Sequence, residues 1–347
     1  MKITHILTFI TIIFLVTACE HKELCFAHAH TTEMQVIFNW KYAPEAHPAS
    51  MRLYLFPETG KEPLIYEFGN HMEGKITVSV GRYRALCMNN DTEFILFRNT
   101  DHYESIKAYL ADGAFPRPVP RAGNTGEQRV KFTPDKLWSD RMEEVEVVAS
   151  AKEQTLTLYP KAIVCHYTVE IKNVENLKYL TEGELFGSLT NMSDGFMLGT
   201  NLPTEELATL PFDMTSDSRS TVNADFYTFG YPATSTNTQY LTVYAILNDG
   251  KKYSFTYDVT EKIHNSPDPA NVHILLDGLP LPKPIDNGGG FNPDVDNKLT
   301  PLITNYNLYE EKLYFKHGNC LYDVGSLLQR RNCGCKHRRH YLFPHTD

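Results

Sequence analysis

Two sets of cysteine and histidine side chains have the types and the short spacing that bind a transition metal. They are His21, Cys25, His28 and His30 near the start of the chain, and Cys333, Cys335, His337 and His340 near its end. A structural zinc site needs four ligands held by folded backbone, whereas the first set lies in a polar spacer and the second lacks the pair spacing of a zinc finger. We therefore predict a solvated spacer and a solvated tail, with no metal and no cofactor.

Motifs for hydrolysis are missing from the sequence. Neither G-x-S-x-G nor H-E-x-x-H occurs, and Gly187-Ser188 lacks the second glycine of a nucleophile elbow. The segment Asn292–Asn297 begins like a calcium loop, but the glycine and the glutamate that such a loop requires are absent. A carboxylate pair of the glycosidase kind stays an alternative, although most Asp and Glu side chains lie at the solvent surface. We predict no catalytic residue and no enzyme.

Cys19 has the position of a residue that is modified covalently. It follows a positive charge at Lys2, an apolar run over Ile6–Val16 and the small residues Thr17 and Ala18, which is the layout of a secretory signal. The apolar run is shorter than the roughly 20 residues of a spanning helix. The final V-T-A-C resembles a lipobox, in which a diacylglycerol is attached to the cysteine and the chain is cut just before it. We predict a signal peptide over residues 1–18 and lipidation, including palmitate, at Cys19; an ordinary cleaved signal is the alternative.

The charge of the chain is acidic and unevenly distributed. A formal charge of −9 over 347 residues leaves no basic patch for nucleic acid over most of the sequence. Residues 297–347 are the exception, with eight Lys or Arg and four acidic residues, a local charge of +4. This atypical basic tail is predicted to be either a small extra segment or a poorly ordered end.

The seven cysteines do not form a dense disulfide framework. Apart from Cys19 and the three in the basic tail, they are Cys25, Cys87 and Cys165. In an exported chain Cys25 and Cys87 could form a disulfide, and a buried free thiol is the alternative for each.

Short runs of alternating apolar and polar residues predict β strands along most of the chain. Met34, Val36 and Phe38 fall on one face of the first strand, and a longer run of the same kind covers 163–171. Asp249-Gly250 lies between two further runs, at 240–248 and 251–259, and predicts a hairpin. One helical turn is expected at 258–264 and a last strand at 272–276. The absence of long helical periods favours an all-β fold of two antiparallel sandwiches.

The predicted organisation divides the chain into five parts. A signal peptide covers 1–18, a lipidated spacer 19–32, an N-terminal β-sandwich 33–150, a C-terminal β-sandwich 151–296 and the basic tail 297–347. A stretch rich in Pro, Gly and Arg between Asp112 and Gly126 is read as a long loop inside the first sandwich.

Several segments, taken together, carry a resemblance to a known family. They are C-E-H-K-E-L-C at 19–25, N-N-D-T-E at 89–93, D-V-T-E-K-I-H-N-S-P-D-P at 258–269, V-H-I at 272–274 and G-G-G-F-N-P-D-V-D at 288–296. With these segments the chain resembles an uncharacterised family of Bacteroidales lipoproteins, which is similar in layout to the fimbrillin-associated anchor and accessory proteins of type V pili. The chain departs from the family after Asp296, where members finish with a short final strand.

The resemblance implies two tandem transthyretin-like (Greek-key) sandwiches and no known catalytic residues. It also implies a lipid anchor in the outer membrane, and Lys22-Glu23 looks like the signal that sends such lipoproteins to the cell surface.

The expected function is structural: a surface-anchored fimbrial anchor or accessory subunit that takes part in cell adhesion and binds a pilin-like partner. An exposed sheet edge would accept a strand from that partner. The alternative is a surface glycan-binding lipoprotein that uses Trp40 or Trp138 for stacking. Trp138 follows Pro134 and Asp135 in an expected loop and is the better candidate, whereas Trp40 ends a core-facing run.

Overall fold

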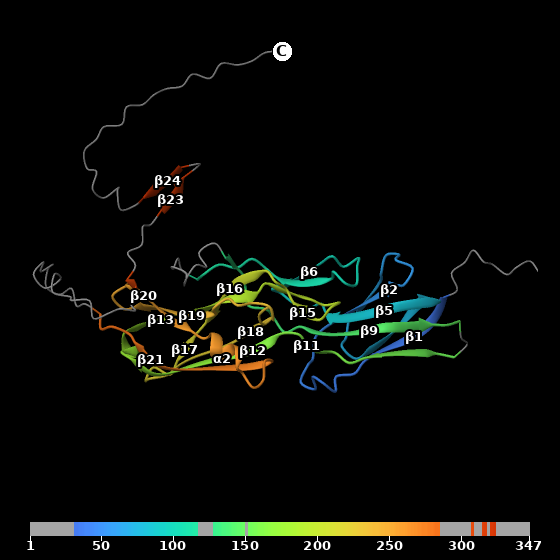
Figure 1. Ribbon diagram of the computed structural model, residues 1–347, viewed down its shortest axis with the longest axis horizontal. Helices are drawn as coiled ribbons and strands as arrows, with labels where there is room; N and C mark the ends of the chain where they lie inside the picture. Colours follow the sequence, from blue (N-terminus) through green and yellow to red (C-terminus); the bar gives the residue numbers. More distant parts are fainter. Residues whose placement is uncertain are drawn as a thin grey trace, which may run out of the picture.

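The computed structural model describes residues 31–116, 128–149 and 152–284, and the short strands at 307–308, 314–317 and 320–323. Apart from one 3₁₀ turn, η1 (Leu177–Tyr179), and one helical turn, α2 (Thr260–His264), the elements in these ranges are β strands. The prediction of an all-β fold is therefore confirmed. Figure 1 shows an elongated molecule with two sets of sheets placed end to end.

The first set of sheets is a β-sandwich whose core is made by alternating side chains. Met34, Val36 and Phe38 are buried as their spacing predicts, and they pack against Leu53 and Leu55 of the opposite sheet. One sheet has the order β10-β1-β4 and the other β11-β9-β5-β2-β3. The strands are β1 (Thr31–Phe38), β2 (Met51–Pro57), β3 (Leu64–Phe68), β4 (Glu73–Ser79), β5 (Gly81–Asn89), β9 (Trp138–Val147), β10 (Gln154–Leu158) and β11 (Lys161–Ala162).

Strand β10 lies in the first sandwich, although the sequence places residues 154–158 in the second. It pairs in parallel with β1, with Leu156 opposite Val36 and Leu158 opposite Phe38. Both leucines are buried in the first core. The last strand of the first sandwich, β11, therefore ends at Ala162, about a dozen residues after the division at 150.

The second sandwich packs a sheet of order β17-β18-β12-β21 against one of order β22-β20-β19-β13-β16-β8. The predicted hairpin at Asp249-Gly250 is confirmed, with Gly250 at φ +77° and the amide of Leu247 donating to the carbonyl of Lys251 at 3.1 Å. The strands are β8 (Arg129–Val130), β12 (Cys165–Glu175), β13 (Leu180–Ser193), β16 (Leu207–Asp213), β17 (Thr215–Ser216), β18 (Val222–Thr228), β19 (Tyr240–Leu247), β20 (Lys252–Asp258), β21 (Asn271–Pro280) and β22 (Asn307–Leu308). A separate hairpin is formed by β23 (Tyr314–His317) and β24 (Cys320–Asp323).

A third sheet joins the two sandwiches and lies above their junction in Figure 1. Its order is β15-β14-β7-β6, so that β7, from the first half of the chain, pairs with β14, from the second. We call it the bridging sheet. Its strands are β6 (Ile95–Arg98), β7 (Lys107–Leu110), β14 (Gly195–Met197) and β15 (Leu202–Pro203).

The core of the second sandwich extends across the junction, through the bridging sheet, onto the outer face of the first sandwich. On β2, Leu53 and Leu55 point into the first core, whereas Tyr54 and Phe56 on the other face join the core of the second sandwich. Ile106 and the other apolar residues around β7 belong to that same core. The sheet that contains β2 is thus buried on both faces.

A substitution at Gly199 tests how tightly the bridging region is packed. A Cβ atom at this position would clash with the backbone carbonyl of Tyr103, which cannot move aside as a flexible side chain could. We expect Gly199→Ala to lower the free energy of unfolding by about 1–3 kcal/mol, measured by urea denaturation. Gly69→Ala is the matched control, since no atom lies within 4 Å of its added Cβ; equal stability of Gly199→Ala and the wild type would contradict the packing.

Candidate functional site

The candidates at the two ends of the chain lie outside the described residues. They are Cys19, the set His21, Cys25, His28 and His30, the set Cys333, Cys335, His337 and His340, and the segment Asn292–Asn297. Within the described ranges, no three His, Cys, Asp or Glu side chains are grouped so as to hold a metal ion. In the same ranges no helix has the length and apolar character needed to cross a membrane.

Trp40 and Trp138 form an edge-to-face pair at the end of the first sandwich. Their ring centroids are 6.1 Å apart at 89°, and Trp40 Nε1 donates to the carbonyl of His71 at 2.6 Å. Trp138 opens β9, so its expected place in a loop is wrong: its amide donates to Asn89 Oδ1 at 2.8 Å and it pairs with Ala162. Both rings are half-buried and pack on each other, which weakens the case for either as a stacking platform.

Ser188, the residue nearest to a nucleophile motif, lies inside β13 and is 1% exposed. Its hydroxyl lies 3.4 Å from the phenol oxygen of Tyr244. A side chain buried in the middle of a strand cannot attack a substrate from solvent.

Cys87 and Cys165 are free thiols with suppressed reactivity. Cys87 is fully buried, and burial raises the pKa of its thiol far above the usual value. Burial, together with the nearby Asp268 carboxylate, raises the pKa of Cys165 to about 11. The free-thiol alternative therefore holds for Cys87 and Cys165. Cys25, the possible disulfide partner of Cys87, lies outside the described residues.

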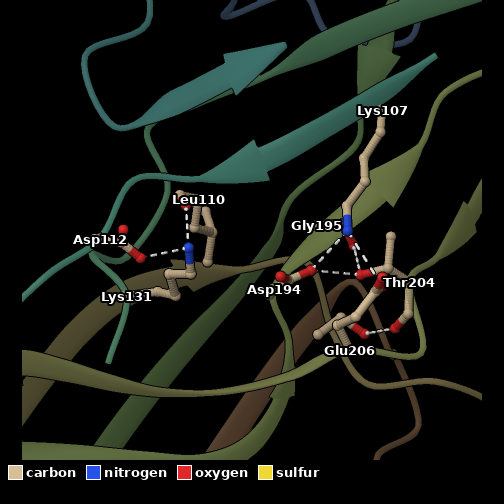
Figure 2. Close-up of polar contacts among 9 residues, drawn as sticks. Lys107, Leu110, Asp112, Lys131, Asp194, Gly195, Thr204 and Glu206 are labelled. Atoms are coloured by element: carbon tan, nitrogen blue, oxygen red, sulfur yellow. Dashed lines mark hydrogen bonds and ion pairs between the residues drawn. The ribbon is translucent and has the colours of Figure 1, made fainter. Parts of the chain in front are cut away.

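Lys107, the first residue of β7, is a buried cation in the bridging sheet (Figure 2). Its Nζ donates to Asp194 Oδ1 at 3.0 Å and to Glu206 Oε2 at 3.2 Å. The Thr204 hydroxyl donates to the same Asp194 oxygen at 2.9 Å. Partial burial acts to raise the pKa of Glu206, but backbone hydrogen bonding and Lys107 outweigh it and hold that pKa below its usual value.

A second buried lysine, Lys131, lies near the first (Figure 2). Its Nζ donates to the carbonyl of Leu110 at 3.0 Å and to Asp112 Oδ1 at 2.8 Å. The hydrogen bond and charge of Lys131 lower the pKa of Asp112, whose side chain is 82% exposed. Neither lysine was predicted from the sequence. The one available signal was the charged residue that begins the otherwise apolar run K-A-Y-L at 107–110.

Strand β21 presents the longest unpaired sheet edge in the part of the chain that the structure describes. It is ten residues long and pairs in parallel with β12 on one side, and no described strand pairs with its other side. The amide of His166 donates to the carbonyl of Ala270, so the amide groups of alternate residues in β21, among them Leu275, point to the free edge. Leu275 is 43% exposed.

An aromatic cleft of about 440 Å³ opens near the junction of the two halves. Its walls include the contacting rings of Phe94 and Phe132, whose centroids are 4.6 Å apart, and Tyr227. Asp213 and Asp225 add carboxylates, and Asp225 Oδ1 lies 2.9 Å from His166 Nε2. The cleft combines flat apolar faces with hydrogen-bond acceptors.

Comparison with known proteins gives matches to a family model and to proteins of Bacteroides ovatus. The model of a family described as a domain of unknown function, DUF5119, matches residues 18–213. A protein of Bacteroides ovatus proposed to be a fimbrium anchoring subunit, Fim4B, is 21% identical over 193 residues, which cover 56% of this chain and 55% of Fim4B. The chain thus spans about half the length of the curated relative that it matches.

Two solved structures from Bacteroides ovatus, both of proteins proposed to be adhesins, match this chain. One has a TM-score of 0.59 and 21% identity, and the match covers 74% of this chain and 94% of that one. The other has a TM-score of 0.47 and 11% identity, and covers 71% and 89%. The first of these similarities extends over both sandwiches.

The raised pKa of Cys165 predicts slow and pH-dependent alkylation. Because the thiol stays protonated far above neutral pH, its reaction with iodoacetamide at pH 8 should be about a hundredfold slower than that of an exposed cysteine of ordinary pKa. The rate should keep rising through pH 9.5, as followed by mass spectrometry of the peptide that contains Cys165. A rate that levels off below pH 9 would contradict the assignment; Asp268→Asn, which removes a neighbouring negative charge, should increase the rate modestly.

Proposed function

The chain belongs to the DUF5119 family, and on that premise we propose that it is a fimbrial anchor or accessory subunit with a role in adhesion. The observation that carries the proposal is the sequence similarity to Fim4B, which covers about half of each chain. The similarity in fold to an adhesin-like structure supports it, since that match covers nearly the whole of the other chain. The proposed role is structural and includes no catalysis.

The partner is proposed to be a pilin-like protein that adds a strand to β21. A free edge of ten residues offers a row of main-chain donors and acceptors, which supply affinity. Alternating side chains beside the edge supply specificity, and the exposed Leu275 is one of them. In the opposite sheet, β20 pairs with the outer strand β22 only at Tyr253 and Ser254. That edge is therefore covered over a short length only.

The attachment is proposed to be a lipid on Cys19 that holds the protein on the outer membrane, facing the cell surface. Acyl chains contribute about 0.8 kcal/mol for each buried methylene, so two or three chains anchor a protein stably. The proposed spacer, 19–32, ends where β1 begins, at Thr31, and so would connect the lipid directly to the first sandwich.

Glycan binding is the second candidate function, and the aromatic cleft favours it. Sugar rings stack on flat aromatic faces, and sugar hydroxyl groups donate hydrogen bonds to carboxylates. Aromatic rings and carboxylates both line this cleft. The cleft replaces Trp138 as the proposed stacking surface, since that ring packs against Trp40. Recovery of polysaccharide, with no pilin-like protein, in a pull-down from native membranes would favour this function over the first.

Strand addition at β21 is tested by Leu275→Pro. Proline removes the amide that points to the free edge, and edge strands tolerate proline there, so the fold should be retained. We expect the affinity for a co-purifying pilin to fall by about tenfold, because one hydrogen bond is lost and the edge is altered. A quantitative pull-down measures this affinity. Leu275→Ala, which keeps the amide, is the matched control. Equal pilin recovery with proline and alanine would show that β21 does not accept a strand.

The anchor is tested by metabolic labelling with radioactive palmitate. Wild type should be labelled and should fractionate with the outer membrane, whereas Cys19→Ala should lose both properties because the acyl chains have no attachment point. Cys25→Ala is the control, since it removes a neighbouring cysteine of the same spacer. Equal labelling of wild type and Cys19→Ala would overturn the assignment.

A further inference from the structure

We propose that Lys107 and Asp194 form an intramolecular isopeptide bond, with Glu206 as the group that moves the proton. The three side chains meet in the bridging sheet, as Figure 2 shows. Lys107 Nζ lies 3.0 Å from Asp194 Oδ1 and 3.2 Å from Glu206 Oε2. An amine, an acceptor carboxyl and a second carboxylate are the groups that amide formation requires.

The fold holds the amine and the carboxyl together out of water. The side chains of Lys107 and Asp194 are only 4% and 13% exposed. Gly195 leaves room for the lysine, because a Cβ there would lie 2.7 Å from Lys107 Cε and would also clash with the carbonyl of Ala108. Reacting groups that are fixed in contact gain a large effective concentration.

The reaction is a condensation that needs no other reactant. The ammonium of Lys107 passes one proton to the Asp194 carboxylate along their hydrogen bond, which gives a neutral amine and a carboxylic acid. The nitrogen lone pair then forms a bond to Asp194 Cγ. Glu206 accepts a proton from that nitrogen and returns it to the departing hydroxyl, so that the C–O bond breaks, one water leaves and Glu206 regains its charge.

Thr204 and Glu206 have positions that suit these roles. The Thr204 hydroxyl donates to Asp194 Oδ1 and so holds the Asp194 carboxyl group in place beside the Lys107 amine. The Glu206 side chain is 62% exposed and its pKa lies below the usual value, so it is an ionised base with access to solvent for the water that leaves.

Lys131 provides an internal contrast within the same region. It is as buried as Lys107, but its one carboxylate partner, Asp112, is 82% exposed, and its second contact is a backbone carbonyl. A solvated carboxylate keeps its charge, and among the described residues no second acid contacts Lys131 to move the proton. This pair should remain an ordinary ion pair.

The bond would join two parts of the chain that are 87 residues apart in sequence. Lys107 belongs to β7, and Asp194 lies between β13 and β14, so the link would connect the two halves covalently within the bridging sheet. A cross-link that closes a long loop stabilises a fold by restricting its unfolded state. Formation of this bond does not depend on the proposed partner or on the proposed lipid anchor.

The test is peptide mapping of the full-length wild-type protein by mass spectrometry after digestion with trypsin. We expect a branched peptide that contains Lys107 and Asp194, lighter by one water than its two parts, with no cleavage after Lys107. Lys107→Arg, which keeps the charge but cannot form this amide, should give two linear peptides. Glu206→Gln should give mostly linear peptides, because the proton relay is lost.

Lys131→Arg is the matched control, and the branched peptide should persist in it. A wild-type protein that yields only the linear peptides, with normal cleavage after Lys107, would overturn the proposal whatever the variants do. A branched peptide that forms fully in Glu206→Gln would overturn the role of Glu206. Neither result depends on recovery of a pilin or on the lipid.

Discussion

The pairing of β7 with β14 is the interaction on which the arrangement of the two sandwiches depends. Through its hydrogen bonds, a strand from the first half of the sequence enters a sheet with a strand from the second. The apolar residues that it carries cover the outer face of the sheet containing β2, where Tyr54 and Phe56 would otherwise be exposed. Without this pairing, the molecule would be two separate sandwiches, one of them with a large apolar surface in water.

A buried charged lysine is energetically unfavourable at such a junction. Moving an ion pair out of water costs several kcal/mol for each ion, and apolar side chains of similar size often serve stability as well or better. Lys107 nevertheless binds the carboxylates of Asp194 and Glu206, and Lys131 binds the carbonyl of Leu110 and the carboxylate of Asp112. Both contacts favour one alignment of β7 with its neighbours, because each joins a specific pair of groups.

Features set by neighbouring residues could be predicted from the sequence, and features set by distant pairing could not. The turn at Asp249-Gly250 and the buried face of β1 follow from local spacing and were predicted correctly. The parallel partner of β1 lies about 120 residues along the chain, and no local pattern names it. Trp138 was misplaced because Pro134 and Asp135 do form a loop, closed by hydrogen bonds from the amides of Glu93 and Phe94 to the Asp135 carboxylate, but that loop ends before residue 138. The lipid site remains a prediction, since Cys19 lies outside the described residues.

The central position of β1 has a mechanical consequence. The strand is flanked on one side by β4, antiparallel, and on the other by β10, parallel. A force that pulls on the chain at Thr31, along the strand axis, would load both ladders in shear, so that many hydrogen bonds must break together. A strand at a sheet edge pulled sideways would instead open one bond at a time. The first strand of this fold is thus placed where tension from the N-terminal side meets the greatest resistance.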